Sequence, residues 1–198
     1  MEQLNHTLFF WINAPEHPST LLLAIATFLA EYVMWSVPIL IGIGWLRGSE
    51  QTRKIMLIAT VSGLTGLLSN QIIGLMWQHP RPFMIGLGHT FIAHVADSSF
   101  PSDHVTLLWA IAFSLLMHRS WRWIGVMLAV LGLPVAWARI YLGVHFPFDM
   151  AGAAAVALLS SGLAFRAMRF YLPFLYGLAL RIHRGLFGPF IQRGWVRP

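Results

Sequence analysis

SSFPSDHVTLLWAIAFSLL, residues 98–116, joins a polar segment to an unbroken apolar run. Ser102, Asp103 and His104 come directly before the apolar residues. A helix needs about 20 apolar residues to cross about 30 Å of hydrocarbon. This run is shorter, so its polar first turn has to lie in the membrane interface. The segment therefore predicts a membrane helix that starts with a hydroxyl, a carboxylate and an imidazole.

The composition of the whole chain agrees with a membrane environment. Of the 198 residues, 57% are hydrophobic and only 10% are charged, and the mean hydropathy is +0.67. Such values predict an integral membrane protein with a single domain, residues 1–198. The chain has no cysteine, which excludes a disulfide framework and a thiol nucleophile. The N-terminal residues lack a basic leader and a small-residue cleavage site, so we expect no removable signal peptide.

Five apolar segments are long enough, or nearly long enough, to cross a bilayer. They are residues 18–46, 55–77, 104–118, 123–142 and 148–165. A sixth segment, residues 170–180, is short and is followed by basic residues. It predicts either an interfacial helix or a sixth span. The expected fold is therefore all-α, a polytopic bundle of five to six transmembrane helices.

The basic residues give this bundle an orientation. With five spans, 11 of the 13 Lys and Arg residues fall on one side of the membrane. Cytoplasmic loops collect such residues, so this side is the expected inner face. The net charge of +6 is then explained by the inner leaflet, and no nucleic-acid partner is expected. Arg81 and Arg139 are the two exceptions, and both fall at the outer face.

Three polar clusters share this outer face. They are QHPRPF at 78–83, FPSDH at 100–104 and ARIYLGVHFPFD at 138–149. Arginine side chains bind phosphate oxygens in a bidentate manner, and a helix N-terminus supplies free N–H groups for the same anion. Either Ser102 or Asp103 can cap the third span. The outer face thus predicts a phosphate-binding site and an active site at this level of the membrane.

The third cluster contains a nucleophile and a residue to orient it. His145 comes directly before the fifth span, and Asp149 lies four residues further on. A carboxylate that accepts from one imidazole nitrogen leaves the lone pair of the other nitrogen free to attack phosphorus. His104, at the start of the third span, is then available as a general acid for the leaving oxygen.

Together these residues resemble the three-part signature of the type-2 phosphatidic acid phosphatase superfamily. That signature reads Lys, six residues, Arg-Pro; then Pro-Ser-Gly-His; then Ser-Arg, five residues, His, three residues, Asp. Here Arg81-Pro82, the segment 101–104 and the spacing of Arg139, His145 and Asp149 match it. The finer pattern, including HPRPF, DSSFPSDH and YLGVHFPFDM, is similar to bacterial undecaprenyl-diphosphate phosphatases of the bacitracin-resistance type.

The resemblance implies an enzyme of the bacterial inner membrane whose site faces the periplasm or the cell exterior. It implies removal of the terminal phosphate of a polyprenyl diphosphate lipid, without metal or other cofactor, to recycle a carrier for cell-wall synthesis. His145 would form a phosphohistidine, Asp149 would orient it, and His104 would protonate the leaving group and later activate water. The remaining residues would hold phosphoryl oxygens: Arg81, Arg139, Ser102 and the backbone around Asp103.

Three positions depart from the family pattern. Gly74 stands where the family has lysine, and Ala138 replaces the serine before the second arginine. Gln71, Gln78 or His79 could take the place of the lysine as donors. The third departure is Asp103, which replaces the usual glycine. A carboxylate beside phosphate is repulsive unless it is directed away, so we expect Asp103 either to cap the third span or to hydrogen-bond His104.

Other residues and functions stay open. Glu31 lies near the middle of the first span. We expect it either to pair with an active-site cation or to be protonated and packed among its neighbours. His89, His94 and Asp97 are either a metal cluster or part of a loop over the site. The alternative functions are a phosphatase for phosphatidic acid or phosphatidylglycerol phosphate, a lipid A phosphotransferase, and a transporter of anionic lipids.

Overall fold

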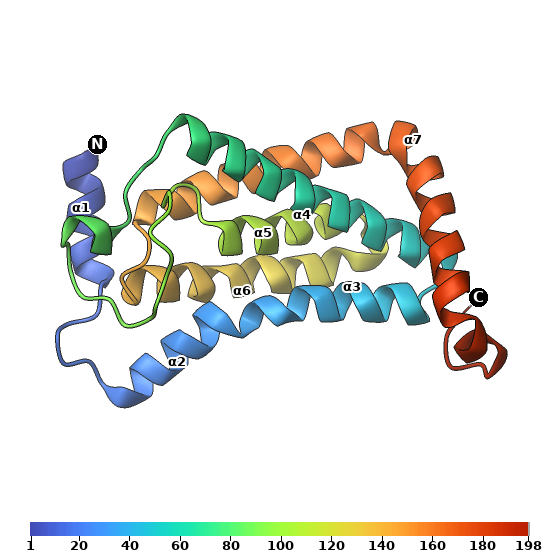
Figure 1. Ribbon diagram of the computed structural model, residues 1–198, viewed down its shortest axis with the longest axis horizontal. Coiled ribbons are helices and arrows are strands. Elements are labelled where there is room, and N and C mark those ends of the chain that lie inside the picture. The colour runs from blue at the N-terminus through green and yellow to red at the C-terminus, as the bar shows by residue number, and fades with distance from the viewer. Residues whose placement is uncertain (198) are drawn as a thin grey trace.

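The predicted apolar segments form a bundle of helices in the computed structural model, which describes residues 1–197 (Figure 1). No strand occurs in that range, so the all-α prediction is confirmed. The membrane-crossing elements are α2 (Thr20–Glu31) with α3 (Ser36–Arg47), α4 (Glu50–Met76), α5 (Asp103–Leu116), α6 (Arg122–Tyr141) and α7 (Pro147–Gln192). Short 3₁₀ turns are η1 (Val33–Trp35), η2 (Pro82–Ile85) and η3 (Arg119–Trp121).

Two of the predicted spans differ from the helices that form. The first span is divided, because η1 separates α2 from α3 directly after Glu31 and Tyr32. The fifth span and the sixth segment belong to a single helix, α7, of 46 residues. Figure 1 shows α7 changing direction so that its second part crosses the end of the bundle. The interfacial alternative for residues 170–180 therefore fits the structure, and a separate sixth span does not.

The shortest span, α5, occupies the centre of the bundle. It packs against α4, α6 and α7, and most of its side chains are buried, including Leu108 and Ile111. A Cβ on Gly132 of α6 would lie 2.1 Å from Nε1 of Trp109, so only glycine allows α6 to approach so closely. Trp109 Nε1 then donates to the carbonyl of Ala129 at 3.0 Å. This packing holds the polar first turn of α5 inside the outer end of the bundle.

An N-terminal helix that the sequence analysis did not predict closes this outer end. Helix α1 (Glu2–Ile12) buries Asn5 and Phe9. The Asn5 side-chain oxygen accepts from the N–H of Phe148 in the first turn of α7, at 3.0 Å. Figure 1 places α1 beside the loops that connect α4 to α5 and α6 to α7. The loops that carry the polar clusters are therefore supported from outside by α1.

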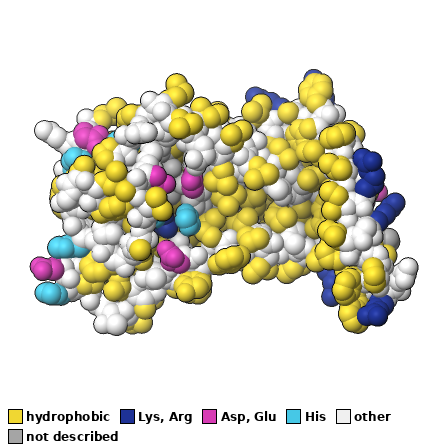
Figure 2. All heavy atoms as spheres, in the orientation of Figure 1, with side chains coloured by type: hydrophobic (Ala, Val, Ile, Leu, Met, Phe, Trp, Pro, Cys, Tyr) yellow, Lys and Arg dark blue, Asp and Glu magenta, His cyan; other side chains and the backbone are white. Residues whose placement is uncertain are grey.

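The two ends of the bundle differ in charge, as the sequence predicts. On the face shown in Figure 2, Lys and Arg side chains gather at the end where α3 and the second part of α7 lie. Most of the acidic and His side chains lie toward the opposite end. Between the ends, Figure 2 shows a hollow lined with hydrophobic side chains, with acidic, His and basic side chains at its outer end. We call this feature the apolar hollow.

Candidate active site

A tight turn after α6 places His145 at the outer end of the bundle. Gly143 has φ of 80°, and a Cβ there would lie 2.1 Å from the carbonyl oxygen of His89. This left-handed conformation and the close contact both require glycine. Pro147 then begins α7. The five residues between Arg139 and His145 therefore consist of the end of α6 and the tight turn at Gly143.

Asp149 connects the start of α7 to the imidazole of His145. Its Oδ2 accepts from the backbone N–H of Phe146 at 2.7 Å, which satisfies a free donor at the helix start. The same oxygen lies 3.2 Å from Nδ1 of His145 and also accepts from the hydroxyl of Ser99. Because Nδ1 donates its proton to Asp149, the lone pair of His145 lies on Nε2.

His145 is kept neutral by its surroundings. Its side chain is buried, and burial lowers its pKa to about 4, which the bond to Asp149 opposes and the nearby charges of Arg139 and Arg81 assist. Burial disfavours the charged form of an imidazole because water no longer solvates it. The imidazole is therefore unprotonated near neutral pH, which is the state that a nucleophile requires.

The guanidinium of Arg81 makes four hydrogen bonds and one further ion-pair contact with groups of the protein. Nη1 donates to the carbonyl of Val144 at 2.9 Å and lies 3.0 Å from Nε2 of His145. Nη2 donates to the carbonyl of Ser98 at 3.2 Å. Asp97 Oδ1 accepts from Nε at 2.9 Å and lies 2.8 Å from Nη2. A guanidinium has five N–H groups, so the protein engages most of those of Arg81.

Arg139 and Ser102 differ from Arg81 because their donors are unused. Arg139 is 1% exposed and Ser102 is fully buried. Arg139 Nε and Nη2 and Ser102 Oγ have no hydrogen-bond partner. Buried polar groups are normally paired, so such a set of unpaired donors indicates an anion that they are built to hold. These residues fit the predicted phosphate-binding role.

His104 lies in the first turn of α5 and is partly buried. Its imidazole has no hydrogen-bond partner within residues 1–197. It interacts electrostatically with Arg139, Arg81 and His145, so it belongs to the same cluster. A free imidazole near the nucleophile fits the predicted general acid.

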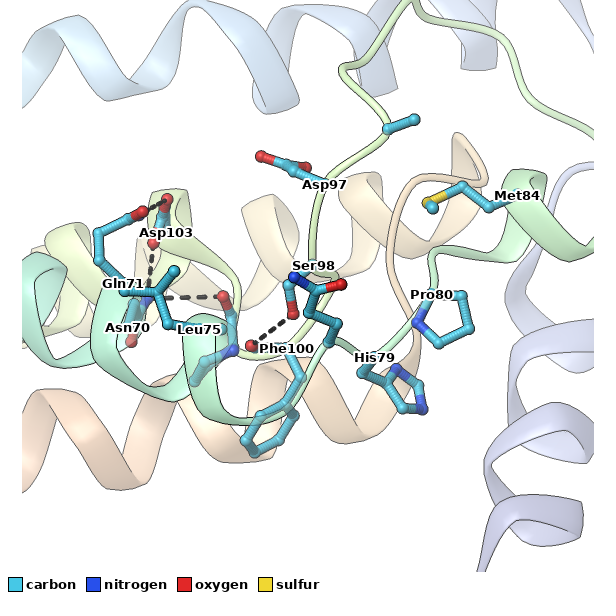
Figure 3. A pocket seen from close by; sticks show the side chains of 14 residues that line it. Asn70, Gln71, Leu75, His79, Pro80, Met84, Asp97, Ser98, Phe100 and Asp103 are labelled. Carbon is cyan, nitrogen blue, oxygen red and sulfur yellow. Dashed lines mark hydrogen bonds between the residues drawn. The ribbon is translucent and has the colours of Figure 1, made fainter.

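Asp103 does neither of the two things expected of it. Ser102 occupies the N-cap position of α5, and no side-chain cap bond forms there. The Asp103 carboxylate is held by α4 instead, because Asn70 Nδ2 donates to Oδ1 at 2.8 Å and Gln71 Nε2 donates to Oδ2 at 3.3 Å (Figure 3). No bond joins it to His104 within residues 1–197. Both expectations are therefore wrong, and Asp103 connects two helices.

Replacement of Asp103 by Asn is expected to affect stability more than catalysis. The amide cannot accept on both sides, so one bond to α4 is lost, at a cost of about 0.5–1.5 kcal/mol, since Gln71 is exposed and Asn70 Nδ2 also donates to Thr106. The thermal unfolding midpoint in detergent should fall while kcat changes little. Gln71→Ala is the matched control, with a smaller decrease in the midpoint. A large loss of kcat with an unchanged midpoint would instead assign Asp103 to the chemistry.

A cavity of about 420 Å³ lies where the family lysine would project. Its lining includes Gly74, Gln78, His79, Asp97 and Asp103, but none of His145, Asp149 and Arg139. Gln78 is exposed. His79 Nε2 lies 3.2 Å from Glu2 of α1. Gln78 and His79 both line this cavity, so a role for either in place of the lysine stays a prediction.

Glu31 is exposed at the end of α2. It forms no ion pair within residues 1–197, although its charge acts on Arg139. Of the two alternatives for His89, His94 and Asp97, the metal cluster does not form in the structure, and Asp97 pairs with Arg81. Within residues 1–197 no three His, Asp or Glu side chains are arranged to hold a metal ion.

Sequence reasoning missed two residues of the site. Ser99 is fully buried and is the third donor to Asp149. Asp97 was expected in a metal cluster or in a loop over the site, but not as a partner of Arg81. The one available signal for both is their position in DSSF, directly before the recognised segment 101–104.

These features define a membrane phosphatase: an imidazole oriented by a carboxylate, a second imidazole, and buried arginine and serine donors at one end of a helix bundle. The chain belongs to the PAP2 superfamily, whose model matches residues 54–172. YbjG of Escherichia coli (strain K12) is 35% identical, over 100% of this chain and 99% of that protein. Undecaprenyl-diphosphatase BcrC of Bacillus subtilis (strain 168) is 36% identical, over 92% of this chain and 93% of its own. The crystal structure of Aquifex aeolicus LpxE shares the fold, with a TM-score of 0.65 and 24% identity over 82% of this chain and 95% of that one.

Proposed function

We propose that the protein hydrolyses undecaprenyl diphosphate to undecaprenyl phosphate and inorganic phosphate. His145 Nε2 attacks the terminal phosphorus, and the bond from this phosphorus to the bridging oxygen breaks. His104 gives a proton to that oxygen, so undecaprenyl phosphate leaves. His104 then takes a proton from water, which attacks the phosphohistidine and releases inorganic phosphate. Asp149 stabilises the positive charge that His145 carries between the two steps.

The observation that carries this proposal is the pairing of a neutral, oriented His145 with unused buried donors on Arg139 and Ser102. Fixed donors stabilise charge that develops on the transferred phosphoryl oxygens. A protein that only transports an anionic lipid needs the arginines but not the dyad of His145 and Asp149. We therefore favour hydrolysis over transport.

The substrate assignment rests on two further observations. The relative BcrC is named an undecaprenyl-diphosphatase, and the apolar hollow beside the charged cluster (Figure 2) suits a long isoprenoid chain. The location follows from charge. The basic end of the bundle would face the cytoplasm, so the site would face the periplasm or the cell exterior in a bacterial inner membrane.

A substrate panel in detergent tests this proposal. We expect kcat/KM for undecaprenyl diphosphate to exceed that for phosphatidic acid and phosphatidylglycerol phosphate by about tenfold or more. The reason is the leaving group, which is a lipid monophosphate for the diphosphate and an alcohol for the other two lipids. A chelator should leave the rate unchanged, since Arg139 and Ser102 supply the stabilising donors. Equal rates for the three lipids would favour a broader lipid phosphatase. Transfer of the phosphate to lipid A, with little free phosphate, would favour a phosphotransferase. No turnover of any lipid would contradict the proposal and favour transport.

A further inference from the structure

Arg81 is held across the nucleophile in this structure. Its Nη1 lies 3.0 Å from Nε2 of His145, which is the atom proposed to attack phosphorus. The Nε2 lone pair therefore accepts from Arg81 and is not free. A phosphorus atom can reach Nε2 only after the guanidinium has moved. Arg81, which the family pattern assigns to phosphate binding, is thus engaged with the protein and not with an anion.

Asp97 is the charged group that keeps Arg81 in this position. Its Oδ1 accepts from Nε at 2.9 Å and lies 2.8 Å from Nη2. Arginine presents these same two N–H groups to a phosphate oxygen. His94 Nδ1 is 3.9 Å from the carboxylate, but burial lowers the pKa of His94. Arg81 is therefore the cation that Asp97 pairs with.

Among the partners of Arg81, Asp97 is the one that can leave. The carbonyls of Val144 and Ser98 belong to the backbone, whereas the Asp97 side chain is 58% exposed. Water solvates the released carboxylate well. The Arg81 side chain is only 6% exposed, so the carboxylate leaves when another anion takes its place on the guanidinium. Asp97 also lines the cavity of about 420 Å³ beside the site. Figure 3 shows Asp97 on the connection that passes this cavity, with no hydrogen bond to the other residues drawn.

We propose that Asp97 occupies the place of a phosphate oxygen on Arg81 in the resting enzyme and is displaced by the diphosphate of the substrate. Displacement frees Nε and Nη2 of Arg81 to bind the phosphate. Nε2 of His145 is exposed when the guanidinium then turns toward the phosphate and Nη1 leaves it. It also releases the segment that carries Asp97. When phosphate leaves, the carboxylate returns to Arg81, so it opposes retention of the product. Asp97 thereby lowers phosphate affinity and promotes turnover. This inference rests on the proposed function only for the identity of the anion.

Binding of methylenediphosphonate tests the competition directly. This diphosphate analogue has no hydrolysable bridge, so the measurement does not depend on turnover. We expect Asp97→Asn to lower its Kd by about three- to fivefold or more in isothermal titration of the full chain in detergent, because the analogue no longer has to displace a carboxylate from Arg81. Asp97→Glu should stay near the parent value. Glu16→Gln, which removes an exposed acid far along the chain from the site, is the charge control and should leave Kd unchanged.

A probe on the segment itself tests displacement. The chain has no cysteine, and Val95 is 72% exposed, so Val95→Cys gives a single labelling site two residues from Asp97. We expect the fluorescence anisotropy of the label to fall when methylenediphosphonate binds. With Asp97→Asn added, it should be low before the ligand is added and then stay constant.

Three results would overturn this inference. They are an unchanged Kd in Asp97→Asn, a raised Kd in that variant, and an anisotropy that rises on binding in the chain with Asp97 intact. A raised Kd would mean that Asp97 supports Arg81 as a phosphate ligand. A rise in anisotropy would mean that the segment closes on the ligand. Absence of phosphate release in the substrate panel would contradict the proposed function and leave these binding results to be judged separately.

Discussion

His145→Ala is expected to abolish turnover of undecaprenyl diphosphate. In the proposed mechanism the change removes the atom that forms the covalent intermediate, so no alternative path through the dyad remains. Loss of a nucleophile from such a catalytic unit costs on the order of 10⁴-fold or more in kcat. Two measurements check this: release of inorganic phosphate, and trapping of acid-labile, base-stable label on the protein from substrate labelled in its terminal phosphate.

The control for this variant is His17→Ala, because His17 is exposed in the connection between α1 and α2. It should keep parent activity and parent trapping. Binding of methylenediphosphonate to His145→Ala should persist, since Arg139 and Ser102 are unchanged. That result separates lost chemistry from lost folding. Full turnover by His145→Ala would rule out the phosphohistidine route.

The spans could be predicted from the sequence because bilayer thickness sets the length of an apolar helix. Residues 123–142 and 55–77 fall within two residues of α6 and five residues of α4 at each end. The break at η1 could not be predicted, since residues 33–35 are as apolar as their neighbours. Helix α1 was missed for another reason. It is short, and tertiary contacts of Asn5 and Phe9 stabilise it, which local sequence does not reveal.

The catalytic cluster was predicted as far as spacing defines it. His145 and Asp149 are four residues apart at a helix start, so their contact follows from local geometry. Asp103 shows the limit of such reasoning. Its partners, Asn70 and Gln71, come from a helix more than 30 positions earlier in the chain. Nothing near Asp103 indicates that α4 will satisfy the carboxylate, and the local choices, a cap or a bond to His104, were the ones expected.

Asp149→Asn is expected to lower kcat by about 10³- to 10⁴-fold while the chain still folds. Oδ2 of Asp149 accepts from Phe146, His145 and Ser99, and an amide oxygen can keep part of this set. The amide group cannot keep the charge that stabilises a cationic phosphohistidine. It also brings an N–H₂ group that favours the wrong tautomer of His145 when it faces Nδ1. Single-turnover measurements should show that formation of the phosphoenzyme has become slow.

Ser99→Ala is the matched variant for this experiment, because it removes one donor to the same oxygen and keeps the carboxylate. With the charge retained and one neutral bond lost, the expected decrease in kcat is about tenfold. The difference between the two variants measures what the charge contributes beyond orientation. Similar losses in both would mean that the hydrogen-bond geometry around His145 dominates. A loss of less than about tenfold in Asp149→Asn would mean that His145 does not depend on this carboxylate. In that case the positive charge formed during phosphoryl transfer would need another partner, and no other acidic side chain lies within 4 Å of His145 in residues 1–197.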